Sequence, residues 1–365
     1  MIIDEEQVLD LLAKSERVFL LEPPYRRKYI PLGLAKISSY VKAHGGVPTF
    51  GRHYVAPSDL ICCTSLFTTE SEAVDRSIEE CEFLDEGVPV VLGGVYASLM
   101  GDKISERFPH VMVFKGYSKV LDQVIPDYSM LWEVEDPWND FSFTFTSRGC
   151  PNRCAYCAVH RIEKDQWVVP NWRDLIVGNK EFAMISDNNL SAYPDHLVEL
   201  VEFLAAKKKR VVFDNGLDCK LITPELAKHL STVRYVRAGL RLAFDRIEED
   251  GVFQAAIKML LSESISRDSI MAYVLFNFTD TPKEADYRMR ECAKLGIRPY
   301  PQKYTPIFRT DSKDYVGKHW TGNLARAFRD FWLFAGSYGK YEFGEWLKVQ
   351  KDYTITAADL AAWRE

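Results

Sequence analysis

The chain has 365 residues, of which 47% are hydrophobic and 27% charged, with a formal net charge of −6. This length predicts two domains, or one large domain with an appendage, and the apolar fraction suffices for a sizeable core. The acidic balance argues against a broad nucleic-acid surface, and no run of about 18 apolar residues is present to cross a membrane.

Residues 1–126 alternate between helical and strand-like patterns. Amphipathic helices are predicted over 5–15, 32–43 and 72–85, and buried strands over 18–21, 60–64, 88–92 and 111–114. This alternation is typical of a doubly wound α/β domain with a parallel sheet. The segment 45–59 leaves little room for a further strand–loop–helix unit. Residues 127–140, rich in Pro, Asp and Trp, are predicted to form a linker.

A predicted strand over 141–147 leads into three cysteines, Cys150, Cys154 and Cys157, in a C-x3-C-x2-C pattern. A cubane iron–sulfur cluster has four irons, and structural zinc sites close with four protein ligands. Three thiolates would therefore leave one metal corner open for a substrate or cofactor. The alternative is a zinc site that borrows His160. The other five cysteines are scattered, which predicts a reducing, cytoplasmic compartment.

Beyond the cysteines the pattern repeats strand, then helix. The predicted strands are 141–147, 182–185, 210–213, 235–242, 270–278 and 298–304, and the helices between them are 195–207, 223–231, 251–262 and 282–295. Six such units form a partial barrel, since a closed eight-unit barrel needs about 250 residues. Residues 311–365 are predicted to form a helical tail whose aromatic side chains pack against the barrel.

The cysteine run, with Tyr156 before its last cysteine, resembles the cluster motif of the radical S-adenosylmethionine (SAM) superfamily. The partial barrel, assigned to 141–310, fits the fold of that family. The resemblance implies that the thiolates hold a [4Fe–4S] cluster and that the amine and carboxylate of SAM bind the fourth iron. An electron from the cluster then cleaves SAM to a 5′-deoxyadenosyl radical, which abstracts hydrogen from a substrate. It also implies Tyr156 as a SAM contact and an electron donor such as flavodoxin or ferredoxin.

The resemblance also nominates SAM contacts at strand ends. Ser186, Asp187 and Asn188 follow the second barrel strand, where the family receives the methionyl amine, although the frequent Gly-Gly-Glu run is absent. An ammonium group bonds well to a carboxylate such as Asp187; the alternative is a helix N-cap. Arg241 and Asp245 share one face of an alternating strand, where Arg241 could clamp the SAM carboxylate and Asp245 could reach the ribose or cap a helix. The alternative is that these two pair with each other.

Three further polar residues at strand ends, Asn277, Gln302 and Lys303, are predicted to line the substrate pocket. The sequence does not identify the substrate or the oligomeric state. A non-enzymatic zinc-binding protein is the remaining alternative to an enzyme.

Residues 1–126 resemble the cobalamin (B12)-binding domain that is fused to many radical SAM enzymes. The matching positions lie at or after strand ends: Leu34, Thr64, Ser65, Leu66, Gly93 and Gly94. No Asp-x-His-x-x-Gly run is present, and the alternative is a fold that has lost the cofactor and keeps these glycines as turns. With cobalamin, the resemblance implies methyl transfer to carbon or phosphorus; without it, hydrogen abstraction followed by rearrangement, oxidation or bond cleavage.

Overall fold

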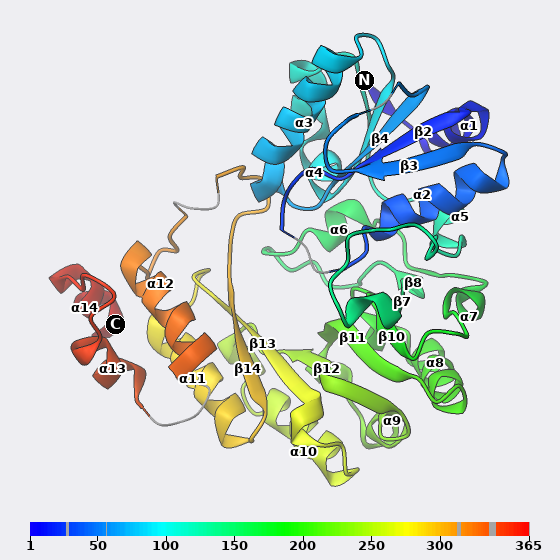
Figure 1. Ribbon diagram of the computed structural model, residues 1–365. Coiled ribbons are helices and arrows are strands. Elements are labelled where there is room, and N and C mark those ends of the chain that lie inside the picture. Colours follow the sequence, from blue (N-terminus) through cyan, green and yellow to red (C-terminus); the bar gives the residue numbers. More distant parts are fainter. Residues whose placement is uncertain (27–28, 56, 312–314, 336–340, 365) are drawn as a thin grey trace. The chain divides into compact units, whose positions relative to one another are not determined.

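The computed structural model describes residues 1–26, 29–55, 57–311, 315–335 and 341–364 (Figure 1). They form two compact units: Met1–Glu181 with Ile307–Asp311, and Phe182–Pro306 with the described part of 312–365. The division follows Glu181 rather than falling in 127–140, so the cysteine loop belongs to the first unit. The domain boundaries expected from the sequence stay predictions.

The first unit carries a six-stranded parallel sheet in the order β1-β6-β5-β4-β2-β3. Its strands are β1 (Ile2–Ile3), β2 (Arg17–Leu21), β3 (Val47–Gly51), β4 (Leu60–Ser65), β5 (Val90–Gly94) and β6 (Val111–Phe114). Its main helices are α1 (Glu5–Lys14), α2 (Leu32–Ala43), α3 (Ser71–Leu84), α4 (Val95–Arg107) and α5 (Lys119–Asp122). The predicted α/β organisation with a parallel sheet is confirmed, and the chain order of the strands reverses between β2 and β4. In such sheets ligands bind outside the carboxyl ends of the strands at that reversal.

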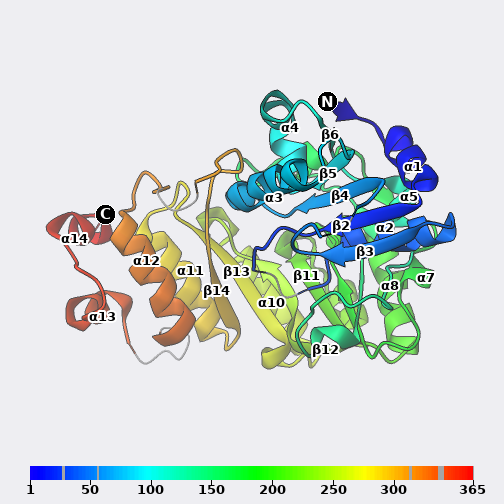
Figure 2. The ribbon, with the colours of Figure 1, turned by 45° about the horizontal axis from the view of Figure 1, so that its top comes forward.

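Figure 2 shows the strands of this sheet side by side, with α3 and α4 next to them. Alternate side chains of a strand point to opposite faces of the sheet. Phe19 of β2 and Ile61 of β4 join one apolar core with Val74 and Ile78 of α3 and Ile104 of α4. Helices α1 and α2 contact each other, and α2 also contacts β2 and β4. Burial of alternate apolar side chains on both faces therefore stabilises the first sheet.

The segment 45–59 holds no full strand–loop–helix unit, as expected, because β3 is followed directly by β4. It does hold a strand that the sequence did not predict: β3 pairs with β2 at the sheet edge, where Pro48 costs no central ladder bond. One prediction for this sheet needs correction. The strand predicted over 88–92 is β5, Val90–Gly94. Gly93 and Gly94 therefore pair with Thr64 and Ser65 of β4 instead of closing the strand as a turn.

The predicted linker, 127–140, is tied to α2 through Asp127. This carboxylate accepts hydrogen bonds from Ser38 Oγ (2.6 Å) and Lys42 Nζ (2.6 Å), and Ser129 donates to it as well. Burial alone would raise the pKa of Asp127, but the bonds from Lys42, Ser129 and Ser38 lower it from 3.8 to about 2. The linker is thus held by a partly desolvated ionic contact.

Folding stability is expected to depend on Asp127 at acidic pH. Because the folded pKa lies below the unfolded one, the stabilisation is complete above about pH 4 and is lost as the pH falls towards 2, amounting to about 2 kcal/mol. Urea unfolding of the wild type and of Asp127→Asn from pH 6 to pH 2 measures this. The variant should lose less stability over that range than the wild type, and equal losses would contradict the assignment.

The second unit contains five consecutive parallel strands, paired in the order β14-β13-β12-β11-β10. They are β10 (Phe182–Ile185), β11 (Arg210–Leu217), β12 (Arg234–Ala243), β13 (Ile270–Phe276) and β14 (Arg298–Lys303). The helices between them are α8 (Pro194–Ala206), α9 (Pro224–Leu230), α10 (Val252–Ser262) and α11 (Pro282–Lys294). The predicted alternation of strand and helix is confirmed here, and it is compatible with Rossmann-like and barrel folds.

The two faces of this sheet differ in burial. Leu240 and Leu242 of β12 are fully buried, whereas Arg241 and Ala243 between and beyond them are only partly buried. The helical residues that follow Pro306 are α12 (Gly322–Asp330), a π-helical turn (Phe331–Ala335), α13 (Phe343–Val349) and α14 (Ala357–Arg364). The rings of Phe328 in α12 and Phe276 in β13 lie 5.0 Å apart, so the tail packs against this sheet as predicted. Among the described residues, no helix combines the length and apolarity needed to cross a membrane.

Candidate functional site

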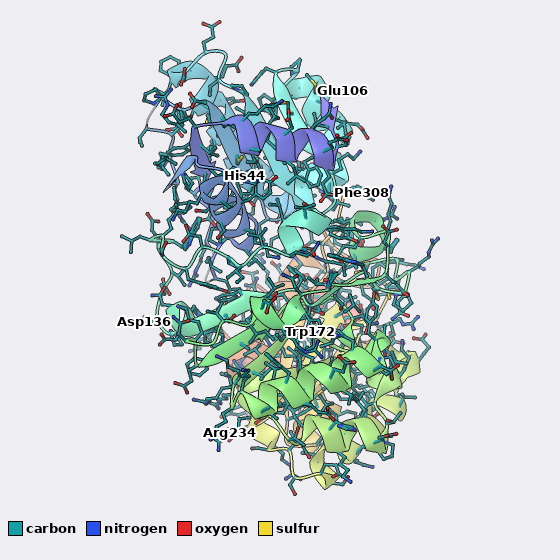
Figure 3. All side chains as sticks on the ribbon, turned by 90° about the vertical axis from the view of Figure 1, so that its right-hand side faces the viewer. His44, Glu106, Asp136, Trp172, Arg234 and Phe308 are labelled. Carbon is teal, nitrogen blue, oxygen red and sulfur yellow. The ribbon has the colours of Figure 1, made fainter. Side chains whose placement is uncertain are left out.

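The three cysteines lie on a loop whose two ends are paired. Strand β8 (Ser147–Arg148) enters the loop and β9 (Trp167–Val168) leaves it, in antiparallel register. The predicted continuous strand over 141–147 is therefore wrong, because β7 (Phe141–Thr144) ends before β8 begins. Ser142 of β7 instead donates to the Leu175 carbonyl (3.0 Å) at the end of α7 (Trp172–Leu175), whose Trp172 is labelled in Figure 3.

Within the loop the cysteines are half-buried. The Cys157 amide donates to the Cys154 carbonyl (3.0 Å), which closes the C-x2-C turn, and the Val159 amide points at Cys157 Sγ (3.5 Å). Backbone N–H groups directed at sulfur are among the features that tune iron–sulfur clusters. All eight cysteines lie in the described residues, and none is disulfide-bonded.

The loop carries three thiols, the donor type that iron–sulfur clusters take from proteins. Two polar atoms nearby, His160 Nδ1 and Tyr117 Oη, are shielded from water without a hydrogen-bond partner. In the described ranges, no three His, Cys, Asp or Glu side chains gather as ligands of a single ion, and the three cysteines do not form such a group.

A buried ionic network anchors the start of the loop. Arg148 bonds both carboxylate oxygens of Asp122 (2.7 and 2.8 Å) and one oxygen of Glu163 (2.7 Å). The other Glu163 oxygen accepts from the Gly149 amide (2.7 Å), and Lys36 Nζ reaches Asp122 (3.1 Å). Burial would raise the pKa of Asp122, but Arg148 and Lys36 hold it below its usual value. These bonds connect Arg148, two residues before Cys150, to α5 and, through Asp122, to α2.

Position 149 must be glycine for the loop to close. Its φ is +87°, and a Cβ there would lie 2.3 Å from the carbonyl oxygen of Asp165, which precedes β9 at the end of the loop. Arg148 also stacks its guanidinium over the Phe145 ring, 3.5 Å from its centroid. The sequence Arg148-Gly149-Cys150 thus fixes where the first thiol emerges.

Glu163→Gln is expected to destabilise this loop. The amide of Gln has only one acceptor oxygen, so it can accept from Arg148 or from the Gly149 amide, but not from both. Its NH2 group then faces the other N–H donor, which costs about 1–3 kcal/mol. Hydrogen exchange of 149–166 should accelerate. The matched control is Asp165→Asn on the same loop, where the ion pair with Lys119 is 66% exposed at Asp165 and contributes less than about 1 kcal/mol. Equal effects in both variants would contradict the anchoring role of Glu163.

The residues after β10 form a turn that is tied to the neighbouring strand. Asn215 of β11 donates to the Ser186 carbonyl (2.6 Å) and to Asn188 Oδ1 (3.3 Å), while Asp187 is buried at 3% exposure. The N-cap alternative for Asp187 is wrong. The next helical turn, Leu190–Ala192, has Asn189 as its N-cap residue, and α8 starts only at Pro194.

Arg241 is held on the less buried face of the second sheet. It forms an ion pair with Asp214 of β11, and its Nη1 also donates to Tyr273 Oη (2.7 Å) and to the Asp214 carbonyl (3.0 Å). Burial raises the pKa of Asp214, while Arg241 acts in the opposite direction. The carboxylate that the sequence suggested as the partner of Arg241 was Asp245, whereas the structure pairs Arg241 with Asp214.

Asp245 lies beyond β12, which ends at Ala243, so the predicted common strand is too long. Its carboxylate accepts from the Leu275 amide (3.1 Å). Arg288 of α11, which is 0% exposed, donates to the carbonyls of Asp245 (2.6 Å) and Leu275 (2.9 Å) and to Asp280 (2.8 Å). One buried cation therefore fixes the carboxyl ends of β12 and β13.

The three predicted pocket residues differ in environment. Asn277 is 0% exposed, with its Oδ1 accepting from the Gly317 amide (2.8 Å) and its Nδ2 facing the Tyr304 carbonyl (3.3 Å). This arrangement favours a structural role for Asn277 over substrate contact. Gln302 is exposed on β14, and Lys303 is half-buried, with its pKa lowered by burial and by Arg329 and Arg326.

The predicted cobalamin positions lie at the carboxyl edge of the first sheet, except Leu34, which is buried within α2. Ser65 donates to the Gly93 carbonyl (2.6 Å) and accepts from the Ala97 amide (3.1 Å), so its hydroxyl is already engaged. Gly94 has φ +103°, and a Cβ there would meet the Ser65 carbonyl oxygen at 2.2 Å. A Cβ at Gly93 would meet open space, while Thr64 is half-buried and Leu66 exposed.

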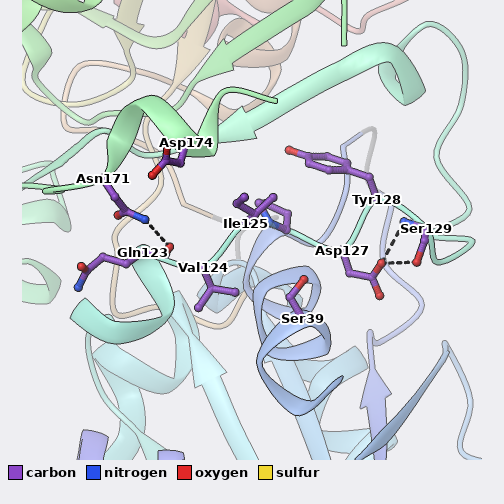
Figure 4. A pocket seen from close by; sticks show the side chains of 10 residues that line it. Ser39, Gln123, Val124, Ile125, Asp127, Tyr128, Ser129, Asn171 and Asp174 are labelled. Carbon is purple, nitrogen blue, oxygen red and sulfur yellow. Dashed lines mark hydrogen bonds between the residues drawn. The ribbon is translucent and has the colours of Figure 1, made fainter. Parts of the chain in front are cut away.

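The first unit also contains an open groove that the sequence did not suggest (Figure 4). Its volume is about 780 Å³, and it runs along Gln123–Ser129 between Ser39 of α2 and the segment with Asn171 and Asp174. Asn171 Nδ2 donates to the Gln123 carbonyl (2.9 Å) across it.

Several residues that contact the predicted site residues were not predicted from the sequence. Asp214, Asn215 and Tyr273 contact predicted site residues, and Asp122 and Glu163 anchor the cysteine loop. A polar Asp-Asn pair inside an otherwise apolar strand was the available signal for the first two. No model of a known protein family matches this chain, and no match was found among curated proteins.

Proposed function

We propose that this chain is a radical SAM iron–sulfur enzyme. The observation that carries the proposal is the cysteine loop. Cys150, Cys154 and Cys157 lie on one loop whose ends, β8 and β9, pair with each other, and Arg148 anchors its start through buried ion pairs with Asp122 and Glu163. In the proposed enzyme these three thiolates hold a [4Fe–4S] cluster. When bound, the cluster supplies the electron for reductive cleavage of SAM to methionine and a 5′-deoxyadenosyl radical.

The chain's own residues would bind and orient SAM. The turn of Ser186, Asp187 and Asn188 is proposed to receive the methionyl ammonium, since carboxylate and carbonyl oxygens accept its hydrogens. Arg241 is proposed to attract the carboxylate with its guanidinium charge. Tyr156 and Asp245 keep the SAM contacts that the resemblance implies, and Gln302 and Lys303 remain candidates for substrate contact. The reducing electron comes from a donor of the flavodoxin or ferredoxin type.

Cobalamin-dependent methyl transfer is the finer form of this proposal. It is supported by the open space at Gly93 and by half-buried Thr64 and exposed Leu66 at the carboxyl end of β4, beside the reversal of the strand order. Ser65 would contribute through packing rather than its hydroxyl. Reconstitution with hydroxocobalamin followed by desalting should leave corrin absorption with the protein. A colourless protein would restrict the proposal to cobalamin-independent hydrogen abstraction.

The test of the main proposal is SAM cleavage. Protein reconstituted anaerobically with iron and sulfide, then reduced with dithionite, is expected to convert SAM to 5′-deoxyadenosine and methionine in equal amounts. Omitting the reductant is the control, because cleavage consumes one electron per SAM. Failure to form 5′-deoxyadenosine in protein that carries an intact cluster would overturn the proposed function.

A further inference from the structure

Strand β11 carries two adjacent polar residues, Asp214 and Asn215, at a place where its ladder with β12 is irregular. From Val211 to Phe213, the partners in β12 jump from Tyr235 to Leu240; from Phe213 to Leu217 they advance only from Leu240 to Leu242. Both strands thus bulge within a few residues. Bulges re-aim side chains and are common next to active sites.

The backbone conformation matches these bulges. Ala238 and Gly216 both have positive φ, +56° and +86°. A Cβ at Gly216 would approach the Arg241 carbonyl oxygen to 3.2 Å, and one at Gly239 would meet the Val211 carbonyl oxygen at 2.5 Å. The two strands therefore come close around Arg241, and this closeness depends on glycine.

The bulges build a cradle for Arg241. Its Nε donates to the Ala238 carbonyl (3.2 Å) at the bulge of β12, and its Nη1 reaches both the carbonyl and the carboxylate of Asp214. Tyr273 of β13 closes the cradle: it accepts from Arg241 (2.7 Å) and donates to the Asp214 carbonyl (3.1 Å). The guanidinium is thereby fixed by three neighbouring strands.

Asn215, the next residue, acts on the other proposed SAM element. Its Nδ2 holds the Ser186 carbonyl and Asn188 Oδ1, and so pins the turn after β10 to β11. Asp214 and Asn215 are neighbours on β11, so this strand links the proposed carboxylate site with the proposed ammonium site. All of these residues belong to the second unit.

We infer that Asp214 and Asn215 are positioning residues that set the distance between the two ends of a zwitterionic α-amino acid, here the methionyl part of SAM. The inference rests on the proposed function. Asp214 orients Arg241 towards the carboxylate, and Asn215 orients the Ser186–Asn188 turn towards the ammonium. Pre-ordered groups bind more tightly because less side-chain freedom is lost on binding.

The test compares SAM with decarboxylated SAM, which keeps the ammonium and lacks the carboxylate. Asp214→Asn should weaken SAM binding about tenfold or more, because hydrogen bonds to charged groups are stronger than those between neutral groups. Binding of decarboxylated SAM should change less than about threefold. Asn215→Ala should weaken both ligands and should speed hydrogen exchange in 186–189 without any ligand. Lys258→Ala, an exposed position on α10, is the matched control.

Each outcome decides. SAM binding by Asp214→Asn within twofold of wild type, or tighter, overturns the role of Asp214, as does an equal loss of both ligands. Unchanged exchange in Asn215→Ala overturns the role of Asn215. If the wild type cleaves SAM but neither variant changes SAM binding or hydrogen exchange, this inference alone is contradicted. Selective SAM binding without cleavage sinks the proposed function and leaves the positioning pair standing.

Discussion

Cys154→Ala is expected to abolish both cluster assembly and SAM cleavage. With two thiolates left on the loop, a cubane loses one of its three protein ligands, and neither Cys150 nor Cys157 can replace it. Iron and sulfide should fall to background after reconstitution, and 5′-deoxyadenosine should fall at least about a thousandfold, below detection. Fold stability should change little, since Cys154 is half-buried on a loop.

The control for this experiment is Cys219→Ala. Burial raises the pKa of Cys219 to about 12, so its thiol stays protonated at neutral pH and is a poor metal ligand. Cluster content should equal that of the wild type. Undiminished 5′-deoxyadenosine from Cys154→Ala, or cluster loss in both variants, would speak against the assignment of the three ligands.

Arg288→Met is expected to reduce the free energy of unfolding by about 3–5 kcal/mol. Removing the cation leaves the Asp280 carboxylate and the carbonyls of Phe244, Asp245 and Leu275 without their buried donor. Such a loss is a large share of the roughly 5–15 kcal/mol that stabilises a typical domain. Chemical denaturation of the whole chain measures it.

Lys294→Met on the same helix provides the comparison. Lys294 pairs with Glu291 three residues away, and its side chain is 69% exposed, so its removal should cost less than about 1 kcal/mol. A cost for Arg288→Met no larger than that of Lys294→Met would show that Arg288 does not hold the strand ends.

The sequence predicted most of the fold because the periodic patterns here are clean. Helix α2 matches its predicted range, 32–43, and β10 matches 182–185. Edge strand β3 was missed because Pro48 and Gly51 are typical of turns, and only the pairing with β2 overrides that local signal. The interruption between β7 and β8 was missed for a similar reason. The alternation of apolar and polar residues continues through Phe145, but β7 has already ended at Thr144, and β8 begins a separate pairing with β9.

The candidate site was predictable where chemistry is local in sequence. Three cysteines within eight positions predict a metal-binding loop, whatever the surrounding fold. Long-range partners could not be read this way: Arg148 finds Asp122 and Glu163 at separations of 26 and 15 residues. Likewise, the ion pair between Arg241 and Asp214 depends on a bulge, which shifts register by an amount that no alternating pattern reveals.

The most direct test of the central claim is the metal and sulfide content of the protein prepared without oxygen. The proposed enzyme should carry about four iron atoms and about four acid-labile sulfides per chain, since that is the composition of the cluster for which three thiolates and one open corner are suited. One zinc atom per chain, with neither iron nor sulfide, would contradict it.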